Sequence, residues 1–208
     1  MNLLILGATG GTGQQLVKQA LEQDHTVTAL ARTPEKLKVK HDRLTVIKGD
    51  VLDEDLLSKL VADKEAIVSA LGVTRSLKAH GLITKAVGSV VKLMNIHNVR
   101  RLILISAFGV GESFAQANPI QKFIFRVPLG SLYKDKTASE EILKKSDLDW
   151  TVIYPVLLTN GPHTGQYRVG EKMAMKGMPK ISRADVADFA LRELSQSRFV
   201  RKFPIVMY

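Results

Sequence analysis

The chain has 208 residues, of which 45% are hydrophobic, so it can bury one substantial core, and its length predicts a single domain over residues 1–208. The absence of cysteine excludes disulfides and thiolate chemistry, and is compatible with the reducing cytoplasm in which we expect the protein. No segment runs for about 18 residues without a charge, and the apolar start is too short for a signal peptide, so we expect no membrane span.

The formal net charge of +10 is the unusual feature of the composition. A basic surface can bind nucleic acid or attract phosphorylated small molecules. Here the lysines and arginines are spread in short pairs such as Arg100-Arg101, without a long basic tract or interleaved aromatic residues. We therefore predict a solvated surface and no nucleic-acid partner, with weak steering of phosphorylated ligands as the functional alternative.

The chain opens with an apolar run that turns directly into glycines. Residues 3–6 are typical of a strand buried on both faces, and the glycines that follow predict a tight turn into a helix. In this context Gly7 permits the turn, Gly10 lets backbone N–H groups approach a pyrophosphate, and Gly13 lets the helix pack closely on the sheet. A dinucleotide site is thus predicted, and an ordinary structural turn is the alternative.

The second predicted strand, residues 26–31, ends at a basic residue, Arg32. A dinucleotide fold that prefers NAD usually has an acid here for the ribose 2′-hydroxyl, whereas a basic residue suits the 2′-phosphate of NADP. Thr33 and Lys36 follow, and a guanidinium can bind phosphate through two parallel hydrogen bonds. We predict NADP(H), the alternative being that Arg32 is an ordinary solvated residue near Glu35.

The third and fourth predicted strands, residues 44–47 and 65–71, end where ligands gather in such sheets. Asp50 follows the third strand and either caps the next helix or approaches the adenine, and Asp53 is the other candidate cap. Gly72 closes the fourth strand and would let the backbone come close to a cofactor.

A helix over residues 82–96 and a fifth strand over 101–105 continue the alternation of strands and helices. This alternation predicts a Rossmann-like α/β fold with a parallel sheet wound on both faces. Ser106 directly follows the fifth strand, beside the expected nicotinamide half of the crevice. Residues 110–130 lack a period, and are either a packed loop or a segment that closes over an aromatic substrate.

The C-terminal part is predicted to contain a helix over 132–145, then a sixth strand over 149–154 that Pro155 stops. Ser182 is the predicted cap of a final helix, and residues 204–207 could add a short strand. No linker or repeat interrupts the chain, so we expect the C-terminal loops to form the substrate crevice of the same domain.

Short motifs along nearly the whole chain carry a family resemblance. They are Gly7-Ala-Thr-Gly-Gly-Thr-Gly13, Gly49-Asp-Val51, Ser69-Ala-Leu-Gly72, Ser106-Ala-Phe108, Ser146-Asp-Leu-Asp-Trp-Thr-Val-Ile-Tyr-Pro155 and Ile181-Ser-Arg-Ala-Asp-Val-Ala187. With them the sequence resembles an atypical short-chain dehydrogenase/reductase of the NAD(P)H-binding, NmrA-like group. It looks most like the biliverdin-IXβ reductase/flavin reductase branch, which has a substrate-side loop similar in length to residues 154–167.

The resemblance implies roles for individual residues. Pyrophosphate contacts would come from Gly7, Thr9, Gly10, Gly11, Thr12 and Gly13. The rest of the cofactor would lie against Arg32, Thr33 and Lys36 at the 2′-phosphate, Asp50 and Val51 at the adenine, and Ala70, Leu71, Gly72 and Pro155 towards the nicotinamide. Ser106 matches a serine that the branch keeps near the site of hydride transfer, and Lys136 matches a lysine that holds the nicotinamide ribose, so these are the predicted catalytic residues.

The sequence departs from the family pattern where a proton donor is expected. Common short-chain dehydrogenases use Tyr-x-x-x-Lys, in which the phenol gives a proton to a carbonyl oxygen. Here Tyr133 and Lys136 are one residue too close, so the tyrosine is expected to point elsewhere. Leu157 replaces a histidine of the branch, and His163 is either a loop residue or an acid. The other histidines lack metal-ligand spacing, so no metal is expected.

These departures favour an acceptor that needs no positioned acid. A flavin, a quinone or a biliverdin-like tetrapyrrole spreads the incoming charge and can take its proton from water, provided that a dry crevice stacks it on the nicotinamide. We predict an NADPH-dependent reductase of such an acceptor, with FMN or FAD among the substrates, acting as a monomer or weak homodimer. The alternative is a non-catalytic NADP(H) sensor that binds a partner protein.

Overall fold

The computed structural model describes residues 1–72, 81–117, 130–175 and 177–208 of the chain. Its centre is an eight-stranded sheet in the order β3-β2-β1-β4-β5-β6-β10-β8. Neighbouring strands in this sheet are parallel except β8 and β10, which are antiparallel. The strands are β1 (Asn2–Leu6), β2 (Thr26–Ala31), β3 (Leu44–Lys48), β4 (Ala66–Ser69), β5 (Arg101–Ile105), β6 (Asp149–Pro155), β8 (Arg168–Gly170) and β10 (Ile205–Met207).

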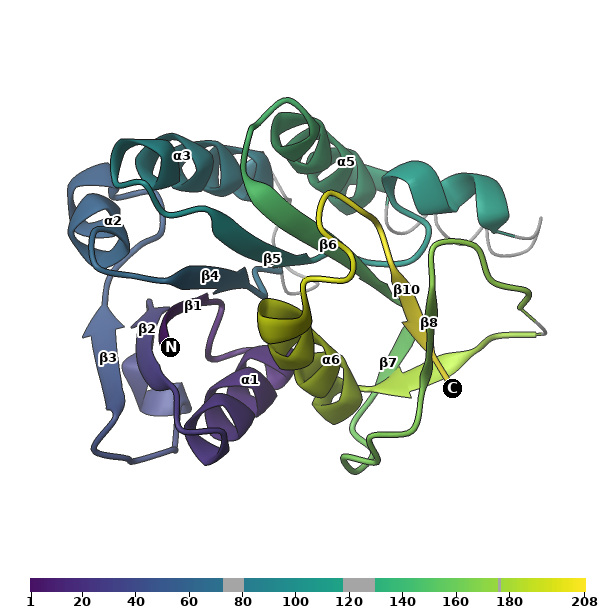
Figure 1. Ribbon diagram of the computed structural model, residues 1–208, viewed down its shortest axis with the longest axis horizontal. Helices are drawn as coiled ribbons and strands as arrows, with labels where there is room; N and C mark the ends of the chain where they lie inside the picture. The colour runs from purple at the N-terminus through teal and green to yellow at the C-terminus, as the bar shows by residue number, and fades with distance from the viewer. Residues whose placement is uncertain (73–80, 118–129, 176) are drawn as a thin grey trace.

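Helices cover both faces of this sheet (Figure 1). One layer is formed by α1 (Gly11–Glu22) and α6 (Arg183–Gln196), and the other by α2 (Glu54–Val61), α3 (Leu82–Ile96) and α5 (Gly130–Lys144). Strands covered on both faces need apolar side chains on both, which explains the uninterrupted apolar runs of β1 and β5. The chain is a single Rossmann-like α/β domain, which confirms the predicted fold class.

Side chains cap the N-termini of two helices and show whether Asp50 or Asp53 caps the helix after the third strand. Asp53 caps α2, because its Oδ1 accepts from the backbone N–H of Leu56 at 3.0 Å. Asp50 instead accepts from Leu52 N–H and stays at the end of β3. Ser182 caps α6 as predicted, and its Oγ accepts from Asp185 N–H at 2.9 Å.

Pro155 ends the sixth strand as predicted, but it is itself part of that strand, which extends one residue beyond Tyr154. It is the last residue of β6, pairs with Val206 of β10, and its carbonyl oxygen accepts from the Phe108 N–H at 2.9 Å. Proline is tolerated there because β5 has already ended at Ile105, so no strand partner needs the missing N–H. The fourth strand ends earlier than expected, at Ser69.

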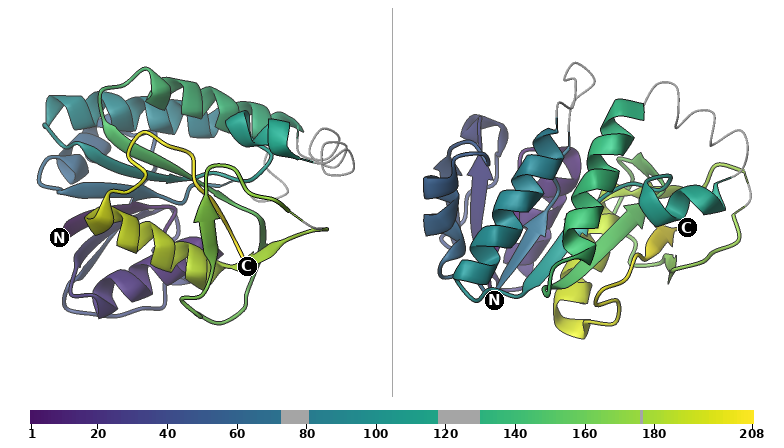
Figure 2. Two further views of the ribbon diagram at one scale, coloured as in Figure 1. Left: turned by 45° about the vertical axis from the view of Figure 1, so that its right-hand side comes forward. Right: turned by 90° about the horizontal axis from the view of Figure 1, so that it is seen from above.

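Short elements that the sequence did not predict gather at the end of the sheet opposite β3 (Figures 1 and 2). They include β8 and a separate parallel pair, β7 (Leu157–Thr159) with β9 (Lys180–Ser182). Two 3₁₀ turns are also present: η1 (Pro34–Lys36) lies between β2 and β3, and η2 (Gly111–Gln116) follows β5. The segment 110–130 was expected to pack as a loop or to close over a substrate. Its residues 118–129 lie outside the described residues. No helix in the described part of the chain could cross a membrane.

Candidate functional site

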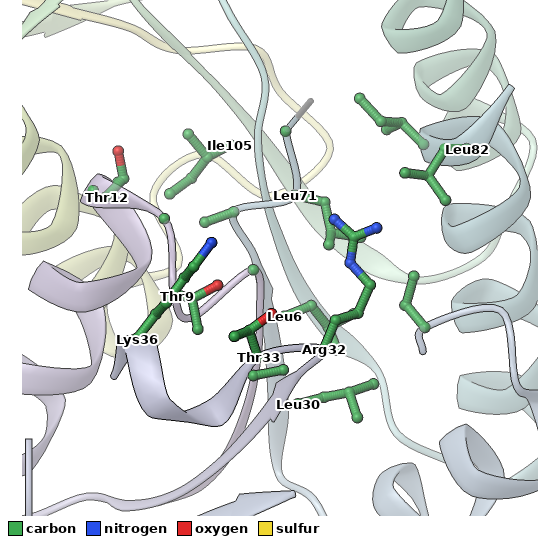
Figure 3. Close-up of a pocket in the computed structure, with 18 of the residues that line it drawn as sticks. Leu6, Thr9, Thr12, Leu30, Arg32, Thr33, Lys36, Leu71, Leu82 and Ile105 are labelled. Carbon is green, nitrogen blue, oxygen red and sulfur yellow. The ribbon is translucent and has the colours of Figure 1, made fainter. Parts of the chain in front are cut away.

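A pocket of about 580 Å³ opens at the carboxyl ends of β1 to β5 (Figure 3). The chain moves from β1 outwards to β2 and β3, and returns to the other side of β1 with β4, so this is the topological switch point of the sheet. Parallel α/β sheets bind ligands at this point. The predicted site residues that line the pocket are Gly7, Thr9, Gly10, Gly11, Thr12, Arg32, Thr33, Lys36, Asp50, Val51, Ala70, Leu71, Gly72, Ser106 and Lys136.

The glycine loop forms one wall of the pocket, where its glycines leave the backbone open to a ligand. Gly7 has a φ of +76°, and a Cβ there would lie 2.5 Å from the carbonyl oxygen of Ala70. The loop leads directly into α1, whose first turn contains no acidic residue. The free N–H groups and the positive end of the helix dipole therefore suit an anion.

Gly13 and Pro155 are the predicted site residues that do not line the pocket. A Cβ on Gly13 would lie 2.1 Å from the carbonyl oxygen of Gly7, so this glycine allows α1 to pack against the loop. This position agrees with the packing role expected from the glycine spacing. Pro155 is buried in β6, where its carbonyl serves the sheet.

Two predicted basic residues, Arg32 and Lys36, line the pocket from the end of β2 and from η1; in Figure 3 the lysine lies towards Thr9 and the arginine towards Leu71. Within the described ranges neither forms an ion pair with an acidic residue. Glu35 does not line the pocket. The arrangement suits a phosphate group, which two neighbouring cations can bind.

A third basic residue, Arg183, lines the pocket and was missed by the sequence analysis. It is the first residue of α6, and its Nη1 donates to Asn160 Oδ1 at 2.7 Å. Its chain covers the glycine loop so closely that a Cβ on Gly11 would lie 2.7 Å from its Cδ. The sequence signal that could have identified it was an arginine directly after the predicted cap Ser182. Arg183 reaches the pocket, however, only through the packing of α6 on α1.

The other end of the pocket holds both predicted catalytic residues. Ser106 follows β5, and its Oγ donates to Glu140 Oε1 at 2.6 Å. Lys136 on α5 donates from Nζ to the carbonyl oxygen of Ile105 at 3.4 Å. Because Lys136 is buried, desolvation lowers its pKa to about 8, while the nearby Glu140 and Asp135 act in the opposite direction.

Glu140 and Tyr154 belong to this end of the structure and were also missed. Tyr154 donates from its hydroxyl to Glu140 Oε2 at 2.7 Å, so both oxygens of the carboxyl group are hydrogen-bonded. Burial raises the pKa of Glu140, whereas Ser106, Tyr154 and the lysines lower it. The available signal was the spacing of Lys136 and Glu140, one helical turn apart on α5.

Tyr133 and His163 lie outside the pocket lining. The Tyr133 hydroxyl donates to the carbonyl oxygen of Phe108 at 3.2 Å, and burial raises its pKa to about 12. The tyrosine therefore does not contribute to the pocket lining. His163 Nε2 lies 3.3 Å from Asp188 Oδ1. Leu157 is exposed, whereas the next residue, Leu158, lines the pocket.

A family model described as NAD(P)H-binding matches residues 7–197. The chain belongs to the NAD(P)H-binding family. This confirms the NAD(P)H-binding character that the motifs of the sequence predict. The glycine loop that begins at Gly7 lies at the start of the matched region.

Several known proteins are similar to this NAD(P)H-binding protein. Photosystem II assembly factor Ycf39 of a Synechocystis species is 25% identical over 221 residues, which cover 99% of this chain and 62% of that relative. The chain therefore spans less than two thirds of that relative's length.

Solved structures show the same fold. A short-chain dehydrogenase/reductase of Veillonella parvula, solved in complex with NADP, has a TM-score of 0.81 and 24% identity, covering 99% of this chain and 93% of that one. ChuY of Escherichia coli O157:H7, described as an anaerobillin reductase, has a TM-score of 0.80 and 22% identity, with 99% and 96% covered.

Proposed function

We propose that this protein is an NADPH-dependent reductase that transfers a hydride to a flat conjugated acceptor, such as a flavin, a biliverdin-like tetrapyrrole or a quinone. The observation that carries the proposal is one pocket with cations at the glycine-loop end and a buried serine and lysine at the other. A dinucleotide can span these ends, because its phosphates and its nicotinamide need such different surroundings.

The residues of the pocket fit NADPH at each part of the molecule. The glycine loop and the start of α1 would bind the pyrophosphate, together with Arg183, while Arg32 and Lys36 would bind the 2′-phosphate. Lys136 would hold the nicotinamide ribose. When bound, the nicotinamide supplies a hydride. The remaining proposed contacts are Thr33, Asp50, Val51, Ala70, Leu71 and Gly72.

The acceptor end suits a flat, largely apolar molecule. Ile83, Ile105 and Leu158 line the pocket together with Ser106. Their side chains would exclude water from the face of the acceptor, and the serine hydroxyl would fix its orientation through a polar atom of the ring. Leu158 follows β6, which supports a substrate crevice formed partly by the C-terminal loops.

The position of Tyr133 supports a conjugated acceptor over a simple carbonyl. A carbonyl reductase must protonate a developing alkoxide, and Tyr133, the nearest match to the phenol that does so in common short-chain dehydrogenases, does not line the pocket. The fold shared with ChuY, described as an anaerobillin reductase, agrees with a reductase of the biliverdin-IXβ reductase/flavin reductase type.

A sensor that binds NADP(H) without turnover is the second candidate. It is favoured by the same position of Tyr133 and by similarity to Ycf39, whose name describes an assembly factor. In that case the cofactor pocket would control binding of a partner protein.

The experiment is to mix purified protein and NADPH separately with FMN, FAD, riboflavin, biliverdin and quinones, and to follow NADPH oxidation. We expect oxidation well above the protein-free background with at least one acceptor. NADPH that binds but is oxidised with none of them, together with co-purification of one partner protein, would favour the sensor.

A further inference from the structure

A buried carboxyl group lies directly behind Ser106. Glu140 is on α5, is 1% exposed, and does not itself line the pocket. Its Oε1 lies 2.6 Å from Ser106 Oγ, so it is one hydrogen bond away from the acceptor end. A buried carboxyl group without a structural ion pair needs another explanation, and none of the ion pairs among the described residues includes Glu140.

Tyr154 determines which oxygen of Glu140 can carry a proton. The phenol donates to Oε2 at 2.7 Å, and burial together with the neighbouring carboxyl group raises the pKa of Tyr154, so it keeps its own proton. With Oε2 accepting, the proton of a neutral Glu140 belongs on Oε1. In that protonation state the hydrogen bond over the 2.6 Å contact is reversed: Oε1 donates to Ser106 Oγ, and the hydroxyl proton of Ser106 is free to turn towards the pocket.

The backbone leaves room for this arrangement at Gly111. A Cβ on Gly111 would lie 2.2 Å from Glu140 Oε2 and 2.8 Å from the Tyr154 hydroxyl oxygen. The residue has a φ of +47°, which also disfavours a side chain. The carboxyl group and the phenol are therefore held together by a position that suits only glycine.

The charged groups around Glu140 come from two elements, α5 and η2. Lys136 and Lys144 lie on its own helix, and both favour the ionised carboxylate, although burial has the larger effect and raises the pKa of Glu140. Glu112 of η2 acts on Tyr154, and it pairs with Lys144 at 2.6 Å. Lys144 and Glu112 are partly exposed, so the far side of the cluster reaches solvent.

We propose that Glu140 is a positioning residue that holds a proton for Ser106 and passes it on during reduction. This inference rests on the proposed reductase function. As the acceptor takes the hydride, NADPH becomes NADP⁺ and a polar atom of the acceptor gains negative charge. The Ser106 O–H bond breaks as that atom takes the proton, and Oε1 of Glu140 gives its proton to Ser106 Oγ.

The step leaves the reduced acceptor, a neutral Ser106 and an ionised Glu140. The net change is one hydride and one proton added to the acceptor. Lys136, which lies close to Glu140, stabilises the new carboxylate. A proton from solvent then restores Glu140 after the product has left. The reaction thus does not depend on a water molecule inside the dry crevice.

The test compares Glu140→Gln with Glu141→Gln, a matched change at the exposed next residue of α5. Turnover is measured against pH with the best acceptor of the panel. We expect Glu140→Gln to lower turnover about tenfold or more, because an amide cannot pass on a proton, and NADPH affinity to change less than about twofold. Wild-type turnover should fall as pH rises through the pKa of Glu140, and this limb should vanish in the variant. Unchanged rate and pH profile would overturn the inference.

A second measurement does not depend on turnover. The side-chain carboxyl carbon of Glu140 is followed by ¹³C NMR against pH in wild type and in Ser106→Ala. We expect a pKa above the ordinary glutamate range that moves when the Ser106 hydroxyl is removed. An ordinary pKa that Ser106→Ala leaves in place overturns the inference even if the enzyme is active. A raised, serine-linked pKa without turnover on any acceptor supports the held proton and contradicts the reductase function.

Discussion

The two ends of the pocket are built in different ways. At the nucleotide end the backbone forms the surface, through Gly7 at positive φ and the first turn of α1. At the acceptor end side chains form it, and Ser106 and its partner Glu140 are 34 residues apart in sequence. The nucleotide end should therefore be sensitive to any added atom, whereas the acceptor end should be sensitive to the loss of a single polar group.

The largest effect is expected at the backbone-built end. Gly13→Ala places a Cβ 2.1 Å from the Gly7 carbonyl oxygen, so α1 must move away from the loop. We expect a loss of about 3 kcal/mol in the free energy of unfolding, measured in urea. NADPH binding should also be lost. In the control Gly88→Ala the Cβ meets only Ile142 at 3.8 Å, so within α3 it should stabilise by about 0.5–1 kcal/mol. Equal effects would contradict the close packing of α1.

The next effect tests how side chains hold the C-terminal loops. Asp185 is buried and accepts hydrogen bonds from Thr164, Gly165 and Tyr208, and these bonds outweigh burial and lower its pKa to about 2. A carboxyl group whose pKa is lower in the folded state than in the unfolded state stabilises the folded protein at pH values above the unfolded pKa. That stabilisation is lost as the pH falls towards about 2. Asp185→Asn should cost about 2–3 kcal/mol near neutral pH.

The measurement is the free energy of unfolding against pH for Asp185→Asn and for Asp42→Asn, a change at an exposed residue. The difference between Asp185→Asn and wild type should shrink below pH of about 4. A difference that does not depend on pH would show that Asp185 acts by packing rather than by its charge.

Arg32→Ala tests the cofactor preference at the nucleotide end. Loss of a charge-assisted pair of hydrogen bonds should weaken NADPH binding about 10- to 100-fold and leave NADH binding nearly unchanged. The affinities are measured by titrating nucleotide fluorescence. Lys38→Ala, which removes a nearby cation that does not line the pocket, is the control for general charge. Equal losses for both nucleotides would defeat the 2′-phosphate assignment.

The smallest effect is expected from Ser106→Ala at the acceptor end. Removing one hydroxyl should lower turnover about tenfold while NADPH affinity stays nearly constant, since the group acts on the acceptor. Steady-state rates with the best acceptor, together with cofactor titrations, measure the two effects separately. Unchanged turnover would make Ser106 a structural residue.

The contrast between the two ends also explains what could be predicted from sequence. The buried strands and the glycine loop are local features, because a strand, a turn and a helix start follow one another within a few residues. Arg32 was readable for the same reason, since it directly follows β2. The parallel sheet followed from the alternation of such local units.

Features formed by distant contacts were not predictable. Arg183 reaches the pocket only because α6 packs on α1, and Glu140 meets Ser106 only because α5 lies against β5 and β6. The three-residue strands β7, β8 and β9 are too short to show an alternating pattern. The sixth strand was predicted to end one residue early, because the hydrogen bonds of the neighbouring segments decide whether the strand includes Pro155.

Single-turnover oxidation of bound NADPH tests the proposed reductase function most directly. The NADPH complex is mixed rapidly with an excess of each acceptor, and the reduced nicotinamide and the reduced acceptor are followed together. The account predicts that NADPH is consumed and acceptor reduced in equal amounts in one phase, and that this phase is slower in Ser106→Ala. Bound NADPH that stays reduced in the presence of every acceptor would contradict it.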